Sequence, residues 1–162
     1  MPRSPRTATL SRMVTRIVVG VDGSGEARHA LAWAVEEARR WGASLRVVHA
    51  WRPPQTYVFD APAAVRPELE QALRDVGEQV VDDSLAAVLS GADPGVEIER
   101  LVVPEPPVEA LLAAVRDADL LVVSSRGRGG FAGLLLGSVS QQVAHHAPCP
   151  VVVVRALEEG AA

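Results

Sequence analysis

The feature that most constrains this chain is an alternation between short apolar runs and longer segments with helical periodicity. The runs consist mainly of valine, leucine and isoleucine, as expected of strands buried on both faces. They lie at Arg16–Val21, Ser44–Ala50, Val96–Val103, Leu120–Ser124 and Val151–Val154. Because the segments between them are long enough for crossover helices, the order predicts a single α/β domain with a five-stranded parallel sheet.

The connecting segments place their apolar residues on one helical face. Apolar residues recur at helical spacing from Ala27 to Ala38, and Gly42 is placed to end that helix. A long helix is expected from Pro67 to about Leu89, with an apolar face formed by Leu69, Leu73, Val76 and Val80. Shorter helices are expected at Val108–Val115 and at Ser138–His146, whereas the proline-rich stretch Trp51–Pro67 indicates a surface loop.

Charge and composition exclude several functions. The net charge of −4 gives no indication of a nucleic-acid partner. All basic residues are arginines, and without lysine neither a Walker-A phosphate loop nor Schiff-base chemistry on a lysine is possible. The longest apolar run is too short to span a membrane. Cys149 is the single cysteine, which suits a reducing compartment, so we expect a cytoplasmic protein with no membrane partner.

Both ends of the chain are expected to lie outside the folded domain. The first twelve residues carry three arginines, two prolines and no acid, which predicts that residues 1–13 form a disordered extension. A transit peptide and a translation start at Met13 stay open as alternatives. The domain is therefore predicted to cover residues 14–156, with a C-terminal tail at residues 157–162.

A glycine-rich loop, SSRGRGGFAGLLLGSVS, follows the fourth predicted strand and leads into a helix. Its glycines let backbone N–H groups approach a ligand closely, and the free N–H groups of a helix start favour phosphate. Ser138 and Ser140 add hydroxyl donors, and Ser138 also suits the N-cap position. Arg126 and Arg128 add positive charge, although either one can simply be a solvated loop residue. The loop thus predicts a phosphate-binding site, and the competing interpretation is a flexible connection.

The glycine spacing resembles the nucleotide signature of the universal stress proteins. That signature is a glycine, any two residues, a glycine, any nine residues, and a glycine followed by serine or threonine. Gly127, the nine residues after it and Gly137-Ser138 match it, while Ser124 stands where the first glycine is expected. The resemblance includes IVVGVDGS, RVVHA and APCPVVVVR, and spans about residues 13–156. If the backbone needs a positive φ at position 124, serine costs about 1 kcal/mol there.

The resemblance implies a nucleotide site at the carboxyl ends of strands one and four. Asp22 would contact the nucleoside, and its carboxylate can accept bonds from ribose hydroxyls, although an Asp at this position also suits a turn or a helix cap. The implied binding residues are Gly20, Val21, Asp22, Ala50, Val123, Ser124, Arg126, Gly127, Gly137, Ser138, Val139 and Ser140.

The resemblance also implies the architecture, the ligand and the assembly. It predicts a Rossmann-like three-layer sandwich, similar to the adenine nucleotide alpha hydrolases, with strand order 3-2-1-4-5. ATP, accompanied by Mg²⁺, is the expected ligand of a regulatory protein with at most slow ATP hydrolysis. Since that order leaves the apolar Val151–Val154 at a sheet edge, a homodimer through this strand is expected. The alternative is a dimeric interaction module that has lost nucleotide binding.

Other motifs favour structural interpretations. GRGGFA at positions 127–132 fits a dinucleotide fingerprint only formally, because no suitable acid follows about 20 residues later. His145, His146 and Cys149 do not form a usual metal-ligand set, since adjacent helical side chains point about 100° apart. HxGH and SGGxDS, the motifs expected of an adenylating enzyme with this fold, are absent from the sequence.

Overall fold

The computed structural model describes residues 14–51, 66–128 and 135–156. The predictions made for residues 1–13, for most of the proline-rich loop and for the C-terminal tail lie outside these residues, as do Gly129, Gly130 and Gly133. The described elements are β1 (Arg16–Gly20), α1 (Gly25–Trp41), β2 (Ser44–Ala50), α3 (Arg66–Leu89), β3 (Ile98–Val103), α4 (Pro107–Ala114), β4 (Leu120–Ser124), α5 (Ser138–His146) and β5 (Val151–Val154).

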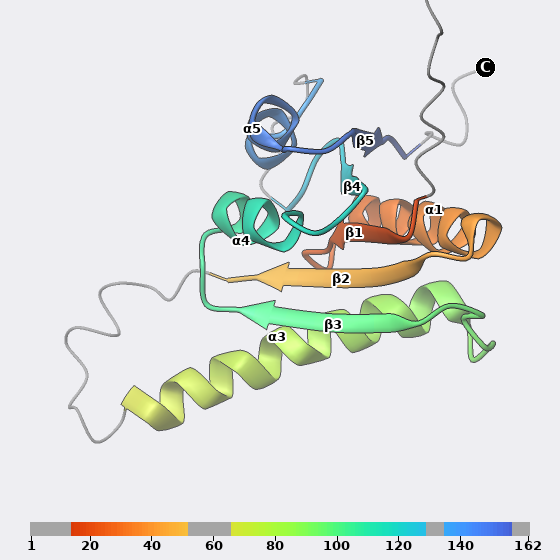
Figure 1. The fold of residues 1–162 in the computed structure, drawn as a ribbon. Coiled ribbons are helices and arrows are strands. Elements are labelled where there is room, and N and C mark those ends of the chain that lie inside the picture. Colours follow the sequence, from red (N-terminus) through yellow and green to blue (C-terminus); the bar gives the residue numbers. More distant parts are fainter. Residues whose placement is uncertain (1–13, 52–65, 129–134, 157–162) are drawn as a thin grey trace, which may run out of the picture.

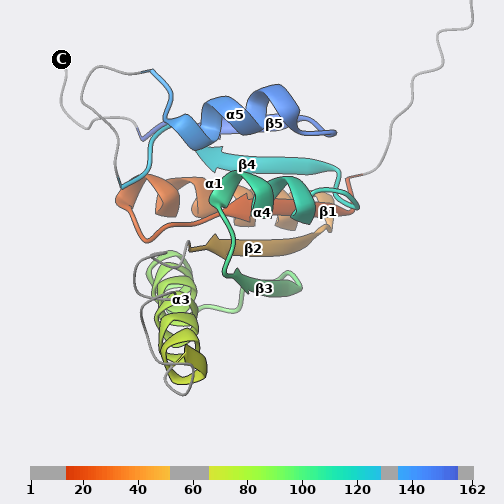
Figure 2. The same ribbon diagram turned by 90° about the vertical axis from the view of Figure 1, so that its left-hand side faces the viewer.

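The strands form one parallel sheet in the order β3-β2-β1-β4-β5, which confirms the predicted fold and strand order. Helices α1 and α3 cover one face, and α4 and α5 cover the other (Figure 1). Figure 2 shows α4 and α5 in front of the sheet with α1 behind it. Because all strands run the same way, their carboxyl ends share one edge, and the order reverses between β1 and β4.

The core has two apolar layers, one on each face of the sheet. Ile17 and Val19 of β1 pack towards α1 and α3, while Val18 packs towards α4 and α5, and all three are fully buried. The middle of the central strand, Ile17–Val19, is therefore apolar, as expected of a strand covered on both faces. Within the described residues, no helix has both the length and the apolar character needed to cross a membrane.

The predicted apolar face of α3 is partly wrong. Val76 is 62% exposed, and the buried position beside it is Gly77. A Cβ atom added at Gly77 would lie 2.7 Å from Val102 Cγ1 of β3, so the helix comes very close to the sheet at this point. A count of apolar residues selects Val76 because glycine carries no apolar side chain, although its smallness is what the close contact requires.

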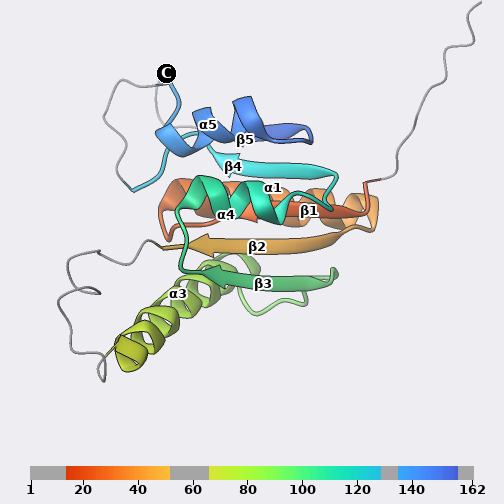
Figure 3. The ribbon, with the colours of Figure 1, turned by 60° about the vertical axis from the view of Figure 1, so that its left-hand side comes forward.

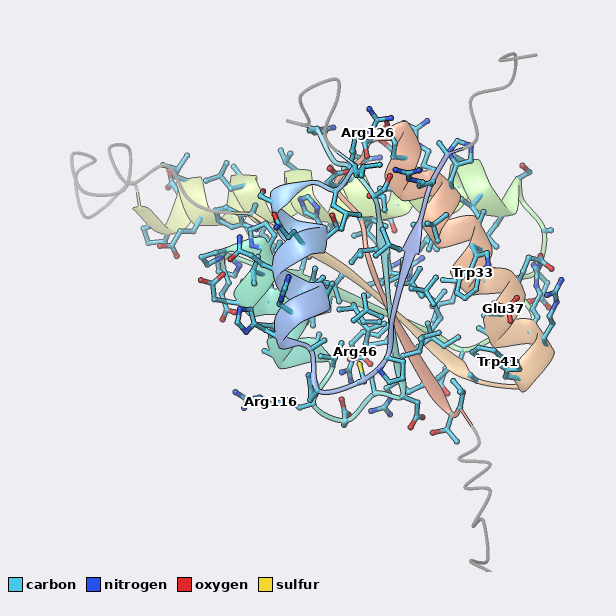
Figure 4. The ribbon with its side chains drawn as sticks, turned by 90° about the horizontal axis from the view of Figure 1, so that it is seen from above. Trp33, Glu37, Trp41, Arg46, Arg116 and Arg126 are labelled. Atoms are coloured by element: carbon cyan, nitrogen blue, oxygen red, sulfur yellow. The ribbon has the colours of Figure 1, made fainter. Side chains whose placement is uncertain are left out.

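The amino edge of the sheet holds a network of paired charges. Arg46 Nε lies 2.8 Å from Glu99 Oε2, and Arg46 Nη1 donates to Asp117 Oδ1 at 2.9 Å and to the Ala114 carbonyl at 2.8 Å. Arg16 pairs with the second oxygen of Asp117. Figure 4 shows Arg46 at the end of the molecule opposite Arg126, which lies at the carboxyl edge. The carboxylates of Glu99 and Asp117 are thus paired with neighbouring arginines.

Candidate functional site

The first wall of the candidate site is the turn between β1 and α1. Gly23 has φ +82°, a left-handed conformation that lets the chain reverse at low cost. Ser24 caps α1, since its hydroxyl oxygen accepts the N–H of Ala27 at 3.1 Å. Asp22 Oδ1 in turn accepts the N–H of Ser24 at 2.9 Å and its hydroxyl at 2.5 Å. Asp22 and Ser24 therefore complete the start of α1 between them.

The second wall is the loop after β4, which contacts the same aspartate. The N–H of Arg128 donates to Asp22 Oδ2 at 2.9 Å. A Cβ atom on Gly127 would lie only 2.6 Å from that oxygen, closer than a side-chain carbon can stand. The absence of a side chain at Gly127 is thus what lets the two loops meet.

The environment of Asp22 keeps its carboxylate ionised. Partial burial acts to raise the pKa of Asp22, but the hydrogen bonds from Ser24 and Arg128 and the positive charge of Arg128 outweigh it. The pKa therefore lies below its ordinary value. Its two oxygens accept three hydrogen bonds from the protein. Because an ionised carboxylate has about four acceptor positions, capacity remains for one further donor.

Ser124, the departure from the glycine signature, is accommodated without backbone strain. Ser90 is the only non-glycine residue with positive φ in the described parts of the chain, so Ser124 keeps an ordinary strand conformation. The Ser124 hydroxyl donates to the Arg126 carbonyl at 2.7 Å. The cost expected for a positive φ does not arise here, and the hydroxyl is satisfied within the loop.

The observed bounds of α5 agree with the predicted ones, but its N-cap lies one residue before the predicted N-cap, Ser138. Gly137 is the N-cap, with an extended backbone, and Ser138 is the first helical residue. Its turn is held by the N–H of Gly137, which donates to the Ser125 carbonyl at 2.7 Å. Ser140 is 3% exposed, and its hydroxyl lies 3.0 Å and 2.9 Å from the carbonyl oxygens of Ser125 and Gly137. The Ser140 hydroxyl thus stabilises this turn.

The start of α5 is open where the start of α1 is closed. Among the described residues, no side chain caps α5. The first N–H groups of a helix have no partners inside it and carry a partial positive charge. Ser138 and Val139, in the first turn, line a cavity. The helix therefore presents an anion-binding end to that cavity.

The cavity has a volume of about 410 Å³ and lies at the carboxyl edge of the sheet. All twelve predicted site residues line it. Five further lining residues were not predicted as site residues: Ala27, Val48, Pro107, Leu111 and Arg128. Strand order brings β2 and the start of α4 to this edge, and no local motif marks those positions. The position of Arg128 in the glycine-rich loop indicated a possible site residue. Its charge alone, however, did not distinguish it from a solvated loop residue.

The cavity has two chemically different ends. On the β2 and α4 side the lining is apolar, with Val48, Ala50 and Leu111. On the β4 and α5 side it holds Arg126, the glycines and the open start of α5. In the turned view of Figure 3, α4 and α5 lie over the same face of the sheet. This arrangement suits a ligand with one flat apolar group and one anionic group.

Comparisons with known proteins agree with this geometry. A sequence model of the universal stress protein family matches residues 13–155. The chain is 39% identical over 140 residues to universal stress protein Rv2623 of Mycobacterium tuberculosis, covering 86% of this chain and 44% of the relative. It is 38% identical over 148 residues to a universal stress protein of Thermus aquaticus, covering 88% of this chain and all of the relative. This chain spans less than half the length of the mycobacterial relatives it matches.

Solved structures show the same fold. A universal stress family protein from Burkholderia pseudomallei is 32% identical with a TM-score of 0.63, covering 90% of this chain and 98% of that chain. A universal stress protein in complex with cAMP is 28% identical with a TM-score of 0.62, covering 88% of this chain and 97% of that chain.

Proposed function

This chain belongs to the universal stress protein family, and we propose that it is an ATP-binding regulatory protein. The observation that carries the proposal is the uncapped start of α5, which opens onto a cavity of sufficient size for a nucleotide. The related structure in complex with cAMP supports an adenine nucleotide as the ligand class.

The two ends of the cavity suggest how the nucleotide lies. The adenine would occupy the apolar end, against Val48, Ala50 and Leu111. The phosphates would meet the first N–H groups of α5, with Arg126 nearby to contribute positive charge. Asp22 lies between the two ends and has acceptor capacity for a ribose hydroxyl. Each part of the ligand thereby meets groups of matching chemistry.

The residues present fit Mg²⁺ only as a companion of the phosphates. Within the described residues there is no group of three or more His, Cys, Asp or Glu side chains that could hold a metal ion. Mg²⁺ commonly keeps several waters and binds through phosphate oxygens with few protein ligands. The Ser138 hydroxyl, at the phosphate end, is the side chain placed to contact it or its waters.

Fast ATP hydrolysis is not expected at this site. Of the described residues that line the cavity, Asp22 alone carries a carboxylate, and its oxygens already accept three protein hydrogen bonds. A general base must reach the proton it removes, and in the proposed binding mode Asp22 would face the nucleoside and not the γ-phosphate. The proposed role is therefore regulation by nucleotide binding.

Nucleotide carried through purification provides the direct test. The purified protein is denatured and the released nucleotide identified by chromatography, and the stripped, refolded protein is titrated with ATP and Mg²⁺ by calorimetry. We expect adenine nucleotide in the supernatant or a saturable heat with ATP. No carried nucleotide together with no heat up to millimolar ATP contradicts the proposal and favours the nucleotide-free interaction module, for which Ser124 is the motivating residue.

We also propose that the protein forms a homodimer through β5. Its four valines are all partly exposed, and among residues 14–51, 66–128 and 135–156 the strand that pairs with β5 is β4, on one side. An apolar edge strand with free backbone groups pairs readily with a second copy. Residues 150, 152 and 154, in or next to β5, bond to β4, as the bonds from the Leu121 and Ser125 N–H groups to the Pro150 and Val154 carbonyls show, so the N–H of Val153 faces the open edge. Val153→Pro removes that N–H and should shift the protein towards the monomer in sedimentation analysis. Val153→Thr, which keeps the N–H, is the control.

A further inference from the structure

Val21, the residue that precedes Asp22, is held by β2 at both its N–H and its carbonyl. The N–H of Val21 donates to the Val48 carbonyl at 2.9 Å, which extends the pairing of β1 with β2 by one residue. The Val21 carbonyl lies 2.9 Å from Nδ1 of His49. A carbonyl oxygen only accepts hydrogen bonds, so Nδ1 carries the proton and donates it. The main chain of Val48 and the side chain of His49 therefore fix the position of Val21.

Holding the Val21 carbonyl also sets the direction of the Asp22 N–H. The peptide unit is planar, and in its trans form the C=O and N–H bonds point in opposite directions. Successive side chains of β2 point to opposite faces of the sheet. His49 lies on the same face as Leu45 and Val47, which pack towards α1 and α3. Val48 and Ala50 lie on the other face. The Asp22 N–H is thus turned away from His49, towards the face on which Val48 and Ala50 line the cavity.

The His49 ring is itself held by α3. A Cβ atom added at Gly77 would lie 3.1 Å from Cδ2 of His49 and 3.4 Å from Cδ1 of Trp51. The ring therefore fills the space that the missing side chain of Gly77 leaves between helix and sheet. His49 is not among the residues that line the cavity. Its side chain reaches the site through its hydrogen bond to the Val21 carbonyl, next to Asp22, while its neighbours on β2, Val48 and Ala50, line the cavity themselves.

We infer that His49 is a positioning residue for the nucleotide site, which acts by donating its Nδ1 proton to the Val21 carbonyl and so orienting the Val21–Asp22 peptide. The expected effect of His49 on ATP affinity rests on the proposed ATP site. The expected effect of His49 on the orientation of the Val21–Asp22 peptide does not, so the two effects are measured separately.

The affinity test compares His49→Leu with His49→Asn. The Asn side-chain nitrogen can take the place of Nδ1 and keep the donor, whereas Leu keeps a branched side chain without it. We expect His49→Leu to weaken ATP binding about tenfold, the equivalent of one hydrogen bond, and His49→Asn to stay within about twofold of the wild type. His29→Leu, at an exposed position on α1, controls for the loss of a histidine. Equal affinities of the Leu and Asn variants, whether weak or unchanged, overturn the inference.

The peptide test uses the ligand-free protein. The ¹³C resonance of the Val21 carbonyl and the amide resonance of Asp22 should move in His49→Leu and stay near their wild-type positions in His49→Asn. Urea unfolding of each variant shows that the folded state is populated under these conditions. If the wild type binds no ATP, the proposed function fails, while these resonances still decide the role of His49. Resonances that do not move in His49→Leu overturn that role.

Discussion

Of the helices that begin at the carboxyl edge of this sheet, α1 and α5 begin differently. At α1, the Ser24 side chain caps the helix and Asp22 binds Ser24, so the turn is completed by the chain itself. At α5, the N-cap is Gly137, and none of the described side chains caps the helix. Free N–H groups at a helix start need partners, and an open start beside a cavity obtains them from water or from an anion.

The hydrogen bonds of the two turns distinguish one that the chain completes itself, at α1, from one that is left open to the cavity, at α5. Serine hydroxyls are present at both, but they are used differently. Ser24 accepts from the helix it caps, whereas the buried hydroxyl of Ser140 points to the carbonyls of Ser125 and Gly137 and leaves the first N–H groups of α5 open. A serine near a helix start is therefore not by itself a cap or a ligand contact.

The largest expected effect comes from closing the open helix start. Gly137 has φ −74°, and a Cβ there would meet its neighbours at 3.5 Å or more, so a side chain is tolerated. Gly137→Asp should cap α5 and add a negative charge where the proposed site would hold the phosphates. We expect ATP affinity to fall at least about 100-fold, while the ligand-free protein becomes more stable by about 0.5 kcal/mol.

Gly137→Ala is the matched control for that change. Alanine is a poorer N-cap than glycine, so stability should fall slightly, while the N–H groups stay free and ATP affinity should remain within about threefold. Calorimetry and thermal unfolding measure both quantities. If Gly137→Asp binds ATP as tightly as Gly137→Ala, the phosphates do not lie at the start of α5.

A smaller effect is expected where the two loops meet. Gly127→Ala would place a carbon 2.6 Å from Asp22 Oδ2, so Asp22 or the loop must move. We expect ATP binding to weaken about tenfold and stability to fall by about 1–3 kcal/mol. The control is Gly25→Ala at the first residue of α1, where an added Cβ meets no atom of the described structure within 4 Å. Equal affinities of the two variants would show that the contact between Gly127 and Asp22 does not shape the site.

Removing the Ser24 cap from the start of α1 should mainly change the stability of the protein. Ser24→Ala removes the cap and one hydrogen bond to Asp22, and we expect a loss of about 1 kcal/mol at pH 7. Because the pKa of Asp22 is lowered in the folded protein, its contribution is present above its unfolded pKa and is lost as pH falls through the folded pKa. The stability difference from the wild type should therefore narrow below about pH 4, as measured by urea unfolding. A difference that widens towards acid pH would contradict this account of Asp22.

The smallest effect on ATP affinity is expected at Ser124, the residue that departs from the glycine signature. Ser124 lacks positive φ, and its hydroxyl is satisfied by the Arg126 carbonyl, so glycine is not needed for the backbone. Ser124→Gly should change ATP affinity less than about threefold in either direction, because only a small, already bonded side chain is removed. Titration of both proteins with ATP measures this. A gain of tenfold or more would show that Ser124 restricts the nucleoside end of the cavity.

The sequence predicted the parts of this structure that depend on local pattern. The bounds of β2, β4, α5 and β5 agree with the predicted segments, because apolar runs and helix ends are encoded nearby in the chain. The apolar end of the cavity was largely not predicted, since Leu111 and Pro107 reach it only through the packing of α4 on the sheet. Gly77 and His49 were missed for a related reason: a close contact between helix and strand has no signal in either segment alone.

The bond between Asp22 and the N–H of Arg128 joins two residues that are 106 positions apart. At about 5–20 residues per second, a ribosome needs roughly 5–20 s to add the second partner after the first. During that interval the nascent chain has the β1 turn but not the loop that closes the cavity over it. A nucleotide that binds only the closed cavity stabilises only chains that have passed this point. For the proposed nucleotide site, the synthesis of Arg128 thus sets the earliest moment at which a nucleotide can influence folding.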